Sequence, residues 1–586
     1  KAGVYPVTAT ISVPNPVTIR GGYAGTAGDQ LADNPETVLD GENSFDKTLM
    51  TITASTDSLD EVVVENFAFV RSNKRGLLKS GITSLKLLSC RIDSNSHTSG
   101  EDDSNGIGAR FSGNVGFTEV TMSNCVVRAN QDATAKWMNL YGHGVYAVNL
   151  KSLNLIDTSF VSNGIAPASA YNIKSSFGYN VRGFAVYATS APIVASGCEF
   201  RLNRGYSQYP EGTRYKYGGI VCVEGAGGGS SFDHCLFAGN SVCNVGEGNG
   251  PGNMDGTLYM SLDSVNSRAC VNHCTFFGNI ADTVGGTAGA YFGSGTFALS
   301  NSVFAANVVG SYAENGADVY LASGKLSISH CFFGGSSAAF VPAANGATLT
   351  YEGGSGDIIY GNPRTVTPIE DVLEMLAGTA TKSFPQCASP LYFKTDAANL
   401  AAVLARDAHL RSGAGYRKNG SSEWFTDVKA VSYAIDAADS SSPFNREVAP
   451  NGGRANLGCY GNTPEASKSA TGKPEISSDI QVTYPDGYSQ PLIEFNLGGN
   501  DAYCATVTVR VYTNENVLVG TYIKYDAVIG EHIDYLLPLY LPQGTTFKVV
   551  VSADAAGGSS VKDAEANVTA ALPPWNGRGG PKNVIH

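Results

Sequence analysis

A six-residue motif of small, apolar and polar positions recurs between Ala68 and Ser336. It consists of a small residue, any residue, an apolar residue, two further residues and then, in eight of its copies, Asn. A strand-like apolar run precedes each copy, and a Gly-led run such as GVYAVNL (144–150) usually follows. The pattern predicts strand, turn, strand and loop in every repeat, with the copies in register. The nine copies read AFVRSN from Ala68, CRIDSN from Cys90, CVVRAN from Cys125, TSFVSN from Thr158, CEFRLN from Cys198, CLFAGN from Cys235, CTFFGN from Cys274, SVFAAN from Ser302 and CFFGGS from Cys331.

One such repeat cannot bury its own apolar face, whereas stacked repeats form a continuous core. We therefore expect an all-β chain that begins with a right-handed parallel β-helix, whose coils lie about 4.8 Å apart. Asn tolerates left-handed backbone, so the Asn of each motif is expected at a turn and in a structural role. The first motif position suits a small buried side chain, and reduced thiols meet that need. Six of the twelve Cys occupy this position: Cys90, Cys125, Cys198, Cys235, Cys274 and Cys331.

The repeats differ mainly in the length of one insertion. Asn73 and Asn95 are 22 residues apart, whereas Asn163 and Asn203 are 40 residues apart. Most of the additional residues fall between the Asn and the next Gly-led strand. Insertions at a single corner of a rod are expected to form walls beside one face, and long loops on a rigid scaffold often carry function. The insertions are 96–107, 131–143, 164–182, 204–217 and 241–255.

The segments outside the repeats have other patterns of apolar and polar residues. Residues 1–30 are expected to cap the first coil, within a β-helix that spans 1–470. Apolar spacing in 363–413 predicts short helices inserted near the last coils. From 471 to 575 alternating apolar and polar residues separated by turn signals predict an antiparallel β-sandwich of immunoglobulin-like or fibronectin-like type, followed by a tail at 576–586.

Three strings near residues 405–469 and one near the start carry a resemblance to a known family. DAHLRSG, AIDAAD and PNGGRANLGCYGN, together with the opening GVYPVTATISVPNPVTIRGGYAG, resemble the parallel β-helix proteins of the choice-of-anchor Q domain group. The resemblance covers roughly residues 1–469 and implies the fold, its cap and an extracellular setting. It implies no activity and transfers no catalytic residue, because the group includes surface proteins as well as polysaccharide-degrading enzymes.

Composition narrows the classes of partner. The net charge of −13 argues against nucleic acid, whose phosphates require a broad basic face. No apolar run is long enough for a transmembrane helix. The chain starts at Lys1 with no charged-then-apolar leader, so we expect a processed secreted or cell-surface protein, extracellular or periplasmic and of bacterial type.

Candidate ligand-binding side chains come from an alignment of the Gly-led strands on Gly108, Gly144, Gly183, Gly219 and Gly256. The alignment places Ile107, His143, Arg182, Gly218 and Asp255 in one column before the Gly, and Arg110, Tyr146, Ala185, Val221 and Leu258 in another after it. His143 and Arg182 would then face one ligand, with Tyr146 close by. Aromatic faces stack on sugar rings and Arg grips carboxylates. The expected substrate-binding residues are Arg110, Trp137, Tyr141, Tyr179, Arg204, Tyr209, Arg214, Tyr217 and Tyr259.

We expect a carbohydrate-active enzyme whose partner is a polysaccharide or another glycan, in the first place a polysaccharide lyase, with a glycoside hydrolase and a non-catalytic glycan binder as the alternatives. A lyase acting on a uronate polymer would use Arg182 to neutralise the carboxylate and His143 or Tyr146 as the base. A glycoside hydrolase would need two carboxylates, for which Asp255 and Glu224 are the candidates. A non-catalytic binding or adhesive rod would need only the groove and the aromatic residues. No cofactor is expected, although oxygen ligands in GEDDSNG (100–106) leave calcium as a minor alternative.

Overall fold

The computed structural model divides the chain into two compact units, one made of 1–408, 437–442 and 456–461 and the other of 409–436, 443–455 and 462–586. The described residues are 1–24, 36–53, 60–97, 105–132, 140–165, 181–208, 217–245, 254–282, 287–309, 318–334, 340–342, 347–351, 358–360, 407–427, 431–469, 472–483, 490–499, 504–537, 544–555 and 558–567.

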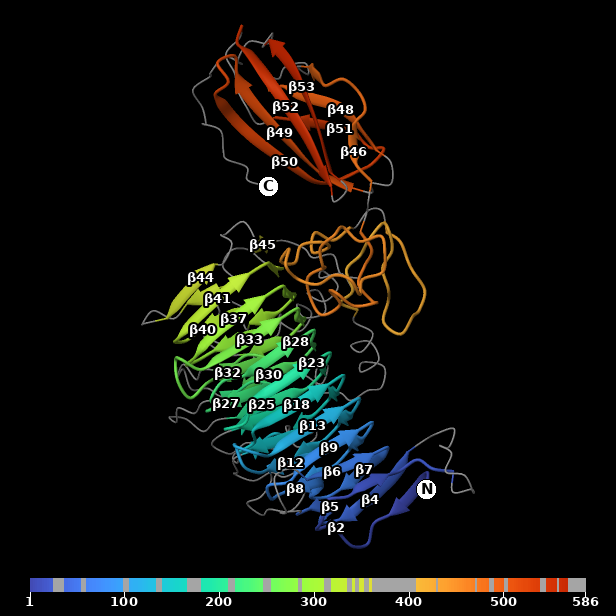
Figure 1. Cartoon of the computed structure of the whole chain (residues 1–586). Coiled ribbons are helices and arrows are strands. Elements are labelled where there is room, and N and C mark those ends of the chain that lie inside the picture. Colours follow the sequence, from blue (N-terminus) through green and yellow to red (C-terminus); the bar gives the residue numbers. More distant parts are fainter. Residues whose placement is uncertain are drawn as a thin grey trace. The chain divides into compact units, whose positions relative to one another are not determined.

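Parallel strands that step along the chain build the first unit (Figure 1). All motif copies lie in one sheet, called sheet A, which has twelve strands among the described residues. Its strands are β1 (Gly3–Pro6), β4 (Thr37–Phe45), β7 (Phe67–Ser72), β10 (Arg91–Asp93), β14 (Val126–Arg128), β19 (Ser159–Val161), β24 (Glu199–Arg201), β29 (Leu236–Ala238), β34 (Thr275–Phe277), β38 (Val303–Ala305), β42 (Cys331–Phe333) and β45 (Ile358–Tyr360).

Two further parallel sheets complete each coil. Sheet B, to which the Gly-led strands belong, contains β2 (Ile11–Val13), β5 (Thr48–Ile52), β8 (Arg75–Lys79), β12 (Ala109–Ser112), β17 (Val145–Val148), β22 (Val186–Thr189), β27 (Val221–Glu224), β32 (Leu258–Ser261), β36 (Ala290–Phe292), β40 (Val319–Leu321) and β43 (Phe340–Pro342). Sheet C contains β3 (Thr18–Arg20), β6 (Glu61–Glu65), β9 (Ser84–Leu88), β13 (Glu119–Ser123), β18 (Ser152–Ile156), β23 (Ile193–Ser196), β28 (Ser230–Asp233), β33 (Arg268–Asn272), β37 (Thr296–Ser300), β41 (Lys325–Ser329) and β44 (Thr348–Tyr351). The predicted parallel β-helix is confirmed.

The insertions are not loops throughout, because each begins or ends as a stacked strand. Directly after the Asn, the chain enters sheet D, formed by β11 (Ser96–His97), β15 (Gln131–Asp132), β20 (Gly164–Ile165), β25 (Arg204–Gln208), β30 (Ser241–Val245), β35 (Ile280–Asp282) and β39 (Val308–Val309). Four insertions return through strands that pair two by two: β16 (Leu140–Tyr141) with β21 (Val181–Arg182), and β26 (Tyr217–Gly218) with β31 (Met254–Asp255). These insertions therefore leave and rejoin the coils at stacked positions.

Columns of identical side chains fill the interior. The rings of Phe160, Phe200, Phe237, Phe276 and Phe304 stack from coil to coil with centroids 4.5–5.1 Å apart. The six motif Cys are buried free thiols, as predicted. The backbone or sulfur of each of these Cys forms a hydrogen bond with the adjacent coil. For example, the Cys90 amide donates to the Cys125 Sγ at 3.4 Å. The column is a packing device rather than a disulfide framework.

The motif Asn residues form a buried amide ladder, which confirms their structural role. The Asn163 Nδ2 donates to the Asn203 Oδ1 at 3.0 Å, and the Asn203 Nδ2 donates to the Asn240 Oδ1 at 3.1 Å. The first motif copy departs from the expected register by one residue. Phe69 pairs with Ile92, so Ser72 rather than Asn73 lies opposite Asn95. Accordingly, the Ser72 amide donates to the Asn95 Oδ1, while Asn73 lies off the ladder.

Part of the PNGGRANLGCYGN string packs on the β-helix within the first unit. The Gly458 amide donates to the Asn301 carbonyl at 2.8 Å, and the Cys459 amide donates to the Thr275 Oγ1 at 2.9 Å. A side chain at position 458 would collide with Thr275, since a Cβ there would lie 2.5 Å from that hydroxyl oxygen. Gly458 therefore permits a close approach of this segment to sheet A.

Antiparallel sheets form the sandwich in the second unit, as predicted. One sheet has the order β50 (Leu518–Val528), β49 (Cys504–Thr513), β52 (Thr546–Ala555), β53 (Gly558–Asn567). The other joins β46 (Pro474–Ile476), β47 (Gln481–Thr483) and β51 (His532–Leu536) to β48 (Leu492–Gly499). Apolar residues of both sheets share one core.

The predicted helical insertion at 363–413 lies almost entirely outside the described residues, as does the tail at 576–586. Among the residues that the structure describes, no helix is long and apolar enough to cross a membrane.

Candidate functional site

A row of tyrosines follows the outer face of sheet B. Strand register places Arg110 beside Tyr146, Tyr146 beside Tyr187, and Tyr187 beside Cys222. The row then continues through Tyr259 and Tyr291 to Tyr320. Their strand neighbours, such as Val145 and Ala147, point into the core, so strand alternation turns the tyrosines outward. We call Tyr146, Tyr187, Tyr259, Tyr291 and Tyr320 the tyrosine column.

The rings of the column lie nearly parallel. Tyr146 and Tyr187 have centroids 5.6 Å apart and planes 5° apart. Tyr141, from β16, stacks on Tyr187 at 4.7 Å. The Arg110 guanidinium lies over the Tyr146 ring, 5.5 Å from its centroid. Offset stacking and cation–π contact both favour this arrangement.

A charged pair lies against the column. Arg182 from β21 forms a salt bridge with Glu224 at the end of β27, and their side chains are 14% and 21% exposed. The Tyr187 hydroxyl donates to the other oxygen of the Glu224 carboxylate at 2.7 Å. Glu224 therefore bonds to a cation and a phenol at once, and most of the Arg182 charge is balanced locally.

Exposure separates two parts of this surface. Tyr187, Tyr259 and Tyr291 are buried, whereas Arg110, Tyr141 and Tyr146 are partly exposed. Burial raises the pKa of the Tyr187 phenol well above its usual range, and burial also raises the pKa of Tyr141 against the opposing effect of Arg182. Both phenols therefore carry their protons at neutral pH, and the Tyr187 hydroxyl donates its proton to Glu224. We call the reachable residues Arg110, Tyr141, Tyr146, Arg182 and Glu224 the ligand-facing cluster, after the role that the sequence leads us to expect of them.

His143 does not belong to this cluster, which corrects the sequence-based placement. Its side chain is 1% exposed and its ring stacks on Phe184 inside the coil, with centroids 5.3 Å apart. Among the residues that the structure describes, neither ring nitrogen has a hydrogen-bond partner. Burial, aided by nearby His97, lowers the pKa of His143 to about 3. A neutral, enclosed imidazole cannot take a proton from a ligand on the outer face, so the pairing of His143 with Arg182 around one ligand is wrong.

His143 was placed beside Arg182 because the sequence alignment matched Gly183 with Gly144. Arg182 of β21 pairs with Tyr141 of β16. The Gly144 amide donates to the Phe184 carbonyl, so His143 lies beside Phe184 and not beside Arg182. Gly183 therefore aligns with Gly142 rather than with Gly144. The same shift hid Tyr187, which the sequence analysis did not select. Alignment of VYAV (145–148) with VYAT (186–189) would have found it, because inward and outward residues must alternate in step.

Other candidate residues are placed elsewhere or are not described. Tyr259 belongs to the column but is nearly covered. Arg204 begins β25 in sheet D, beside Gly164 and Ser241, and not in the tyrosine column. The backbones of Tyr217 and Asp255 lie in the paired strands β26 and β31, where Asp255 pairs with Gly218; their side chains are outside the description. Trp137, Tyr179, Tyr209 and Arg214 lie outside the described residues.

Metal binding finds no support in the residues described. Most of the acidic string at 100–106 lies outside them, and only Asn105 and Gly106 are included. Their backbone carbonyls accept hydrogen bonds from the buried Arg75 guanidinium, at 2.8 and 2.9 Å. Among the described side chains, no three His, Cys, Asp or Glu converge on a point where a metal ion could sit.

No protein-family model, curated protein or solved structure matches the chain. The chemistry of the site therefore rests on its geometry. The ligand-facing cluster offers aromatic faces, a guanidinium over a ring and one carboxylate held by Arg182 and Tyr187.

Proposed function

We propose that the protein binds a polysaccharide along the outer face of sheet B, with the ligand-facing cluster as the contact surface. The observation that carries the proposal is the stack of Arg110, Tyr146, Tyr187 and Tyr141, which runs along the coil axis and not across it. A ligand that repeats along its own length suits a surface that repeats along the rod. Coils about 4.8 Å apart offer successive positions to successive parts of such a polymer.

Each part of the cluster has a role in this binding. The partly exposed Tyr141 and Tyr146 present ring surface to the C–H faces of a sugar. Glu224 accepts hydrogen bonds from sugar hydroxyls at lone pairs that Arg182 and Tyr187 leave open, while Arg110 donates beside the Tyr146 ring. The covered tyrosines, Tyr187 among them, hold this surface rigid from behind.

Cleavage is a second candidate with a narrower basis. Glu224 is a partly exposed carboxylate positioned by two partners, as a catalytic acid–base or nucleophile must be. A hydrolase also needs a second carboxylate within about 5–9.5 Å, for which Asp255 remains the candidate. A lyase would use Arg182 as the cation, although Glu224 already balances its charge, and Tyr146 as the base in place of His143.

We also propose an extracellular setting, within the choice-of-anchor Q domain group of β-helix proteins. The support is the resemblance of the opening segment and of PNGGRANLGCYGN, the latter packed by its glycine against the β-helix. That group supplies the expected location and no residue role.

Affinity electrophoresis of the whole chain through gels that contain soluble polysaccharides tests the binding proposal. We expect at least one polysaccharide to retard the protein, and Tyr146→Ala to abolish the retardation. Tyr351→Ala, which removes an exposed tyrosine from sheet C, is the matched control and should migrate as the unmodified protein does. Equal retardation of all three proteins, or none on a broad panel, contradicts the proposal.

The same polysaccharides distinguish binding from cleavage. A lyase produces an unsaturated sugar and rising ultraviolet absorbance, whereas a hydrolase produces reducing ends without that absorbance. If retarded polysaccharides give neither signal, the protein is a binder.

A further inference from the structure

A short hairpin in the second unit holds two cations against one indole ring. The backbones of Tyr416 and Phe425 bond to each other in both directions, at 2.8 and 2.9 Å, and form an antiparallel bridge. The next residues towards the turn, Arg417 and Trp424, therefore lie opposite each other on one side of the hairpin. The Arg417 guanidinium carbon lies over the Trp424 ring, 4.5 Å from its centroid, and the Lys468 Nζ lies over the same ring at 4.1 Å. We call Arg417, Trp424 and Lys468 the cation–indole site.

Gly415 allows Lys468 to reach the ring. The Lys468 amide donates to the Gly415 carbonyl at 2.7 Å, so the two backbones lie side by side. A Cβ at residue 415 would lie 3.2 Å from the Lys468 Cδ and 3.2 Å from a Trp424 ring carbon. The Lys468 chain and the indole thus pack over a position that has no side chain. The site is therefore built from two segments that are far apart in the sequence.

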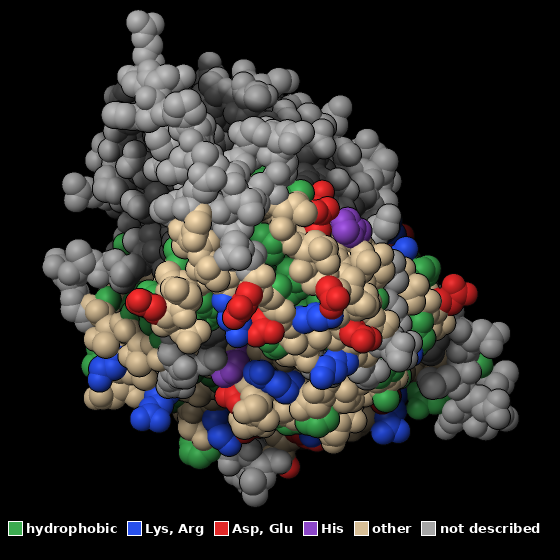
Figure 2. Space-filling model, turned by 90° about the horizontal axis from the view of Figure 1, so that it is seen from above, with side chains coloured by type: hydrophobic (Ala, Val, Ile, Leu, Met, Phe, Trp, Pro, Cys, Tyr) green, Lys and Arg blue, Asp and Glu red, His purple; other side chains and the backbone are tan. Residues whose placement is uncertain are grey.

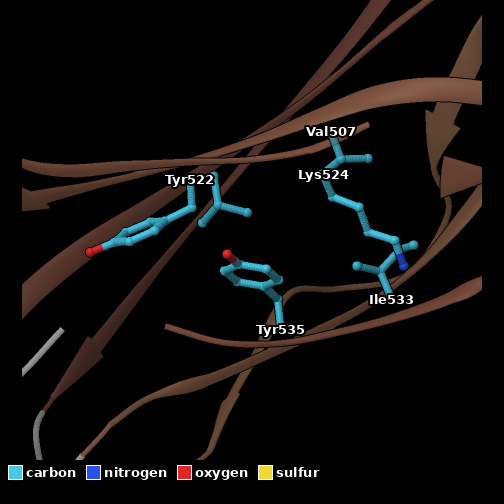
Figure 3. Close-up of a pocket in the computed structure, with 6 residues that line it drawn as sticks. Val507, Tyr522, Lys524, Ile533 and Tyr535 are labelled. Carbon is cyan, nitrogen blue, oxygen red and sulfur yellow. The ribbon is translucent and has the colours of Figure 1, made fainter. Parts of the chain in front are cut away.

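The charges of the two cations are not balanced by an acid. Within the described part of the chain neither Arg417 nor Lys468 forms a salt bridge, and the guanidinium donates to the Ser422 carbonyl. Acidic and basic side chains are interspersed on the face of the molecule that Figure 2 shows. Lys524, which Figure 3 shows beside the packing gap of the sandwich core, donates to Glu531 at 2.8 Å. The cation–indole site is therefore a local excess of positive charge in a chain whose net charge is −13.

The other side of the hairpin carries balanced charges. Lys418 lies over the Phe425 ring, 4.1 Å from its centroid, and the hairpin register places Glu423 across from Lys418. Farther from the turn, Arg411 forms a salt bridge with Asp427 at 3.3 Å. The excess of positive charge is thus confined to the side that carries the cation–indole site.

We propose that the cation–indole site binds an oxyanion, namely the sulfate or carboxylate group of an acidic ligand. A ring face attracts a cation but has no net charge, so Trp424 holds the two side chains in place without neutralising them. Two like charges at one ring repel each other, and an anion that contacts both removes this repulsion and is attracted by each.

Arg417 and Lys468 can both donate to such an anion. Arg417 has N–H groups beyond the one that bonds to Ser422, and Lys468 has three ammonium hydrogens. Both side chains and Trp424 are partly exposed, so the anion reaches them from solvent. The site does not include the ligand-facing cluster, and the proposal does not rest on polysaccharide binding there. The same chemistry is offered by a free inorganic anion and by the charged groups of an acidic polysaccharide.

Isothermal titration calorimetry of the whole chain tests the site and distinguishes the two sources. The probes are sodium sulfate, dextran sulfate and polygalacturonate, with uncharged dextran as the reference. We expect at least one charged probe to bind, and the Arg417→Met, Lys468→Met double variant to weaken that binding more than tenfold. Met retains an unbranched chain that packs on the indole, so the substitutions remove the charge and keep most of the packing. Binding of sulfate alone to the unmodified protein identifies a free anion as the ligand, and binding of a charged polymer without sulfate identifies a polymer-borne group.

Two control variants separate the site from other charges and surfaces. Lys418→Met removes a cation from the other side of the same hairpin, and Tyr146→Ala alters the ligand-facing cluster; neither should change the affinity that the double variant loses. Melting temperatures establish that each variant is folded, and if the double variant is not, Arg417→Met and Lys468→Met singly should each weaken binding severalfold. Binding that these variants leave unchanged, an equal loss in Lys418→Met, equal binding of uncharged dextran, or no binding of any charged probe would overturn the proposal.

Discussion

The Tyr187 hydroxyl donates a 2.7 Å hydrogen bond to the carboxylate of Glu224, which lies on the next coil and also forms a salt bridge with Arg182. This relationship joins an aromatic column and a charged pair into a single surface. It also determines how each partner should respond to substitution.

Removing either member of the Arg182–Glu224 pair should lower stability more than removing both. Arg182→Met leaves the partly buried Glu224 carboxylate without its cation, and Glu224→Gln leaves the Arg182 guanidinium without its anion. Each substitution should lower the free energy of unfolding by about 1–2 kcal/mol after allowance for solvent screening. The double variant should recover part of that loss, because no unpaired charge remains. Melting temperatures of the three variants measure the effect. Strictly additive losses would show that the pair contributes no coupling.

His143→Phe should leave glycan binding unchanged and make the protein more resistant to acid. The folded pKa of about 3 lies below the ordinary value near 6.5, so the unfolded chain binds this proton first. Stability is complete above pH 6.5 and falls by up to about 1.4 kcal/mol per pH unit as pH drops from 6.5 towards 3. Phe removes that dependence and can stack on Phe184 in the same way.

Melting temperatures at several values of pH, for the His143→Phe variant and the unmodified protein, test this role. Retardation by polysaccharide should be equal for the two. Loss of polysaccharide binding in the variant would show that His143 contributes to the binding site.

Asn203→Ala should destabilise the β-helix by at least about 2 kcal/mol. The amide accepts from Asn163, and it donates to the Phe160 carbonyl and to Asn240, so its loss leaves several buried groups unsatisfied. Asn73→Ala is the matched control, because Asn73 stands off the ladder and its amide bonds to the Asn43 carbonyl at an exposed position. Its cost should stay below about 1 kcal/mol. Equal costs in urea-induced unfolding would contradict the one-residue shift of the first motif.

Alkylation should separate the cysteines by burial. Cys270 is exposed, whereas Cys235 and Cys331 are buried, and burial raises the pKa of Cys331 to about 12. Only the thiolate reacts. Iodoacetamide treatment of the folded chain followed by peptide mapping should therefore find Cys270 modified and the six motif Cys intact until denaturant is added. Modification of the motif Cys in the folded protein would mean that the column opens to solvent.

The fold could be predicted from the sequence because a single physical requirement explains the residue at each periodic position. The thiol at the first motif position and the Asn at its last position recur because every coil repeats the same packing and the same turn. The site was predicted only in part. Arg110, Tyr141, Tyr146, Arg182 and Glu224 were selected and do come together, but the partner of Arg182 is Glu224 and not His143.

Register explains the difference. Gly142, Gly144 and Gly183 are equally good markers of a strand entry, and glycine reveals nothing about which face its neighbours occupy. The alignment on Gly144 is displaced by two residues from the observed register, so it placed Tyr146 beside Ala185 instead of Tyr187, and His143 beside Arg182 instead of Phe184. The burial of the middle tyrosines was also beyond prediction, because it depends on what covers the outer face and not on strand alternation.

A crystal structure of the protein soaked with an oligosaccharide from a polysaccharide that retards it tests the central claim most directly. We expect sugar density beside Tyr146 and Tyr141, within hydrogen-bonding distance of Glu224 and extending along the coil axis. Density confined to another face of the β-helix, with the ligand-facing cluster bare, would contradict the account.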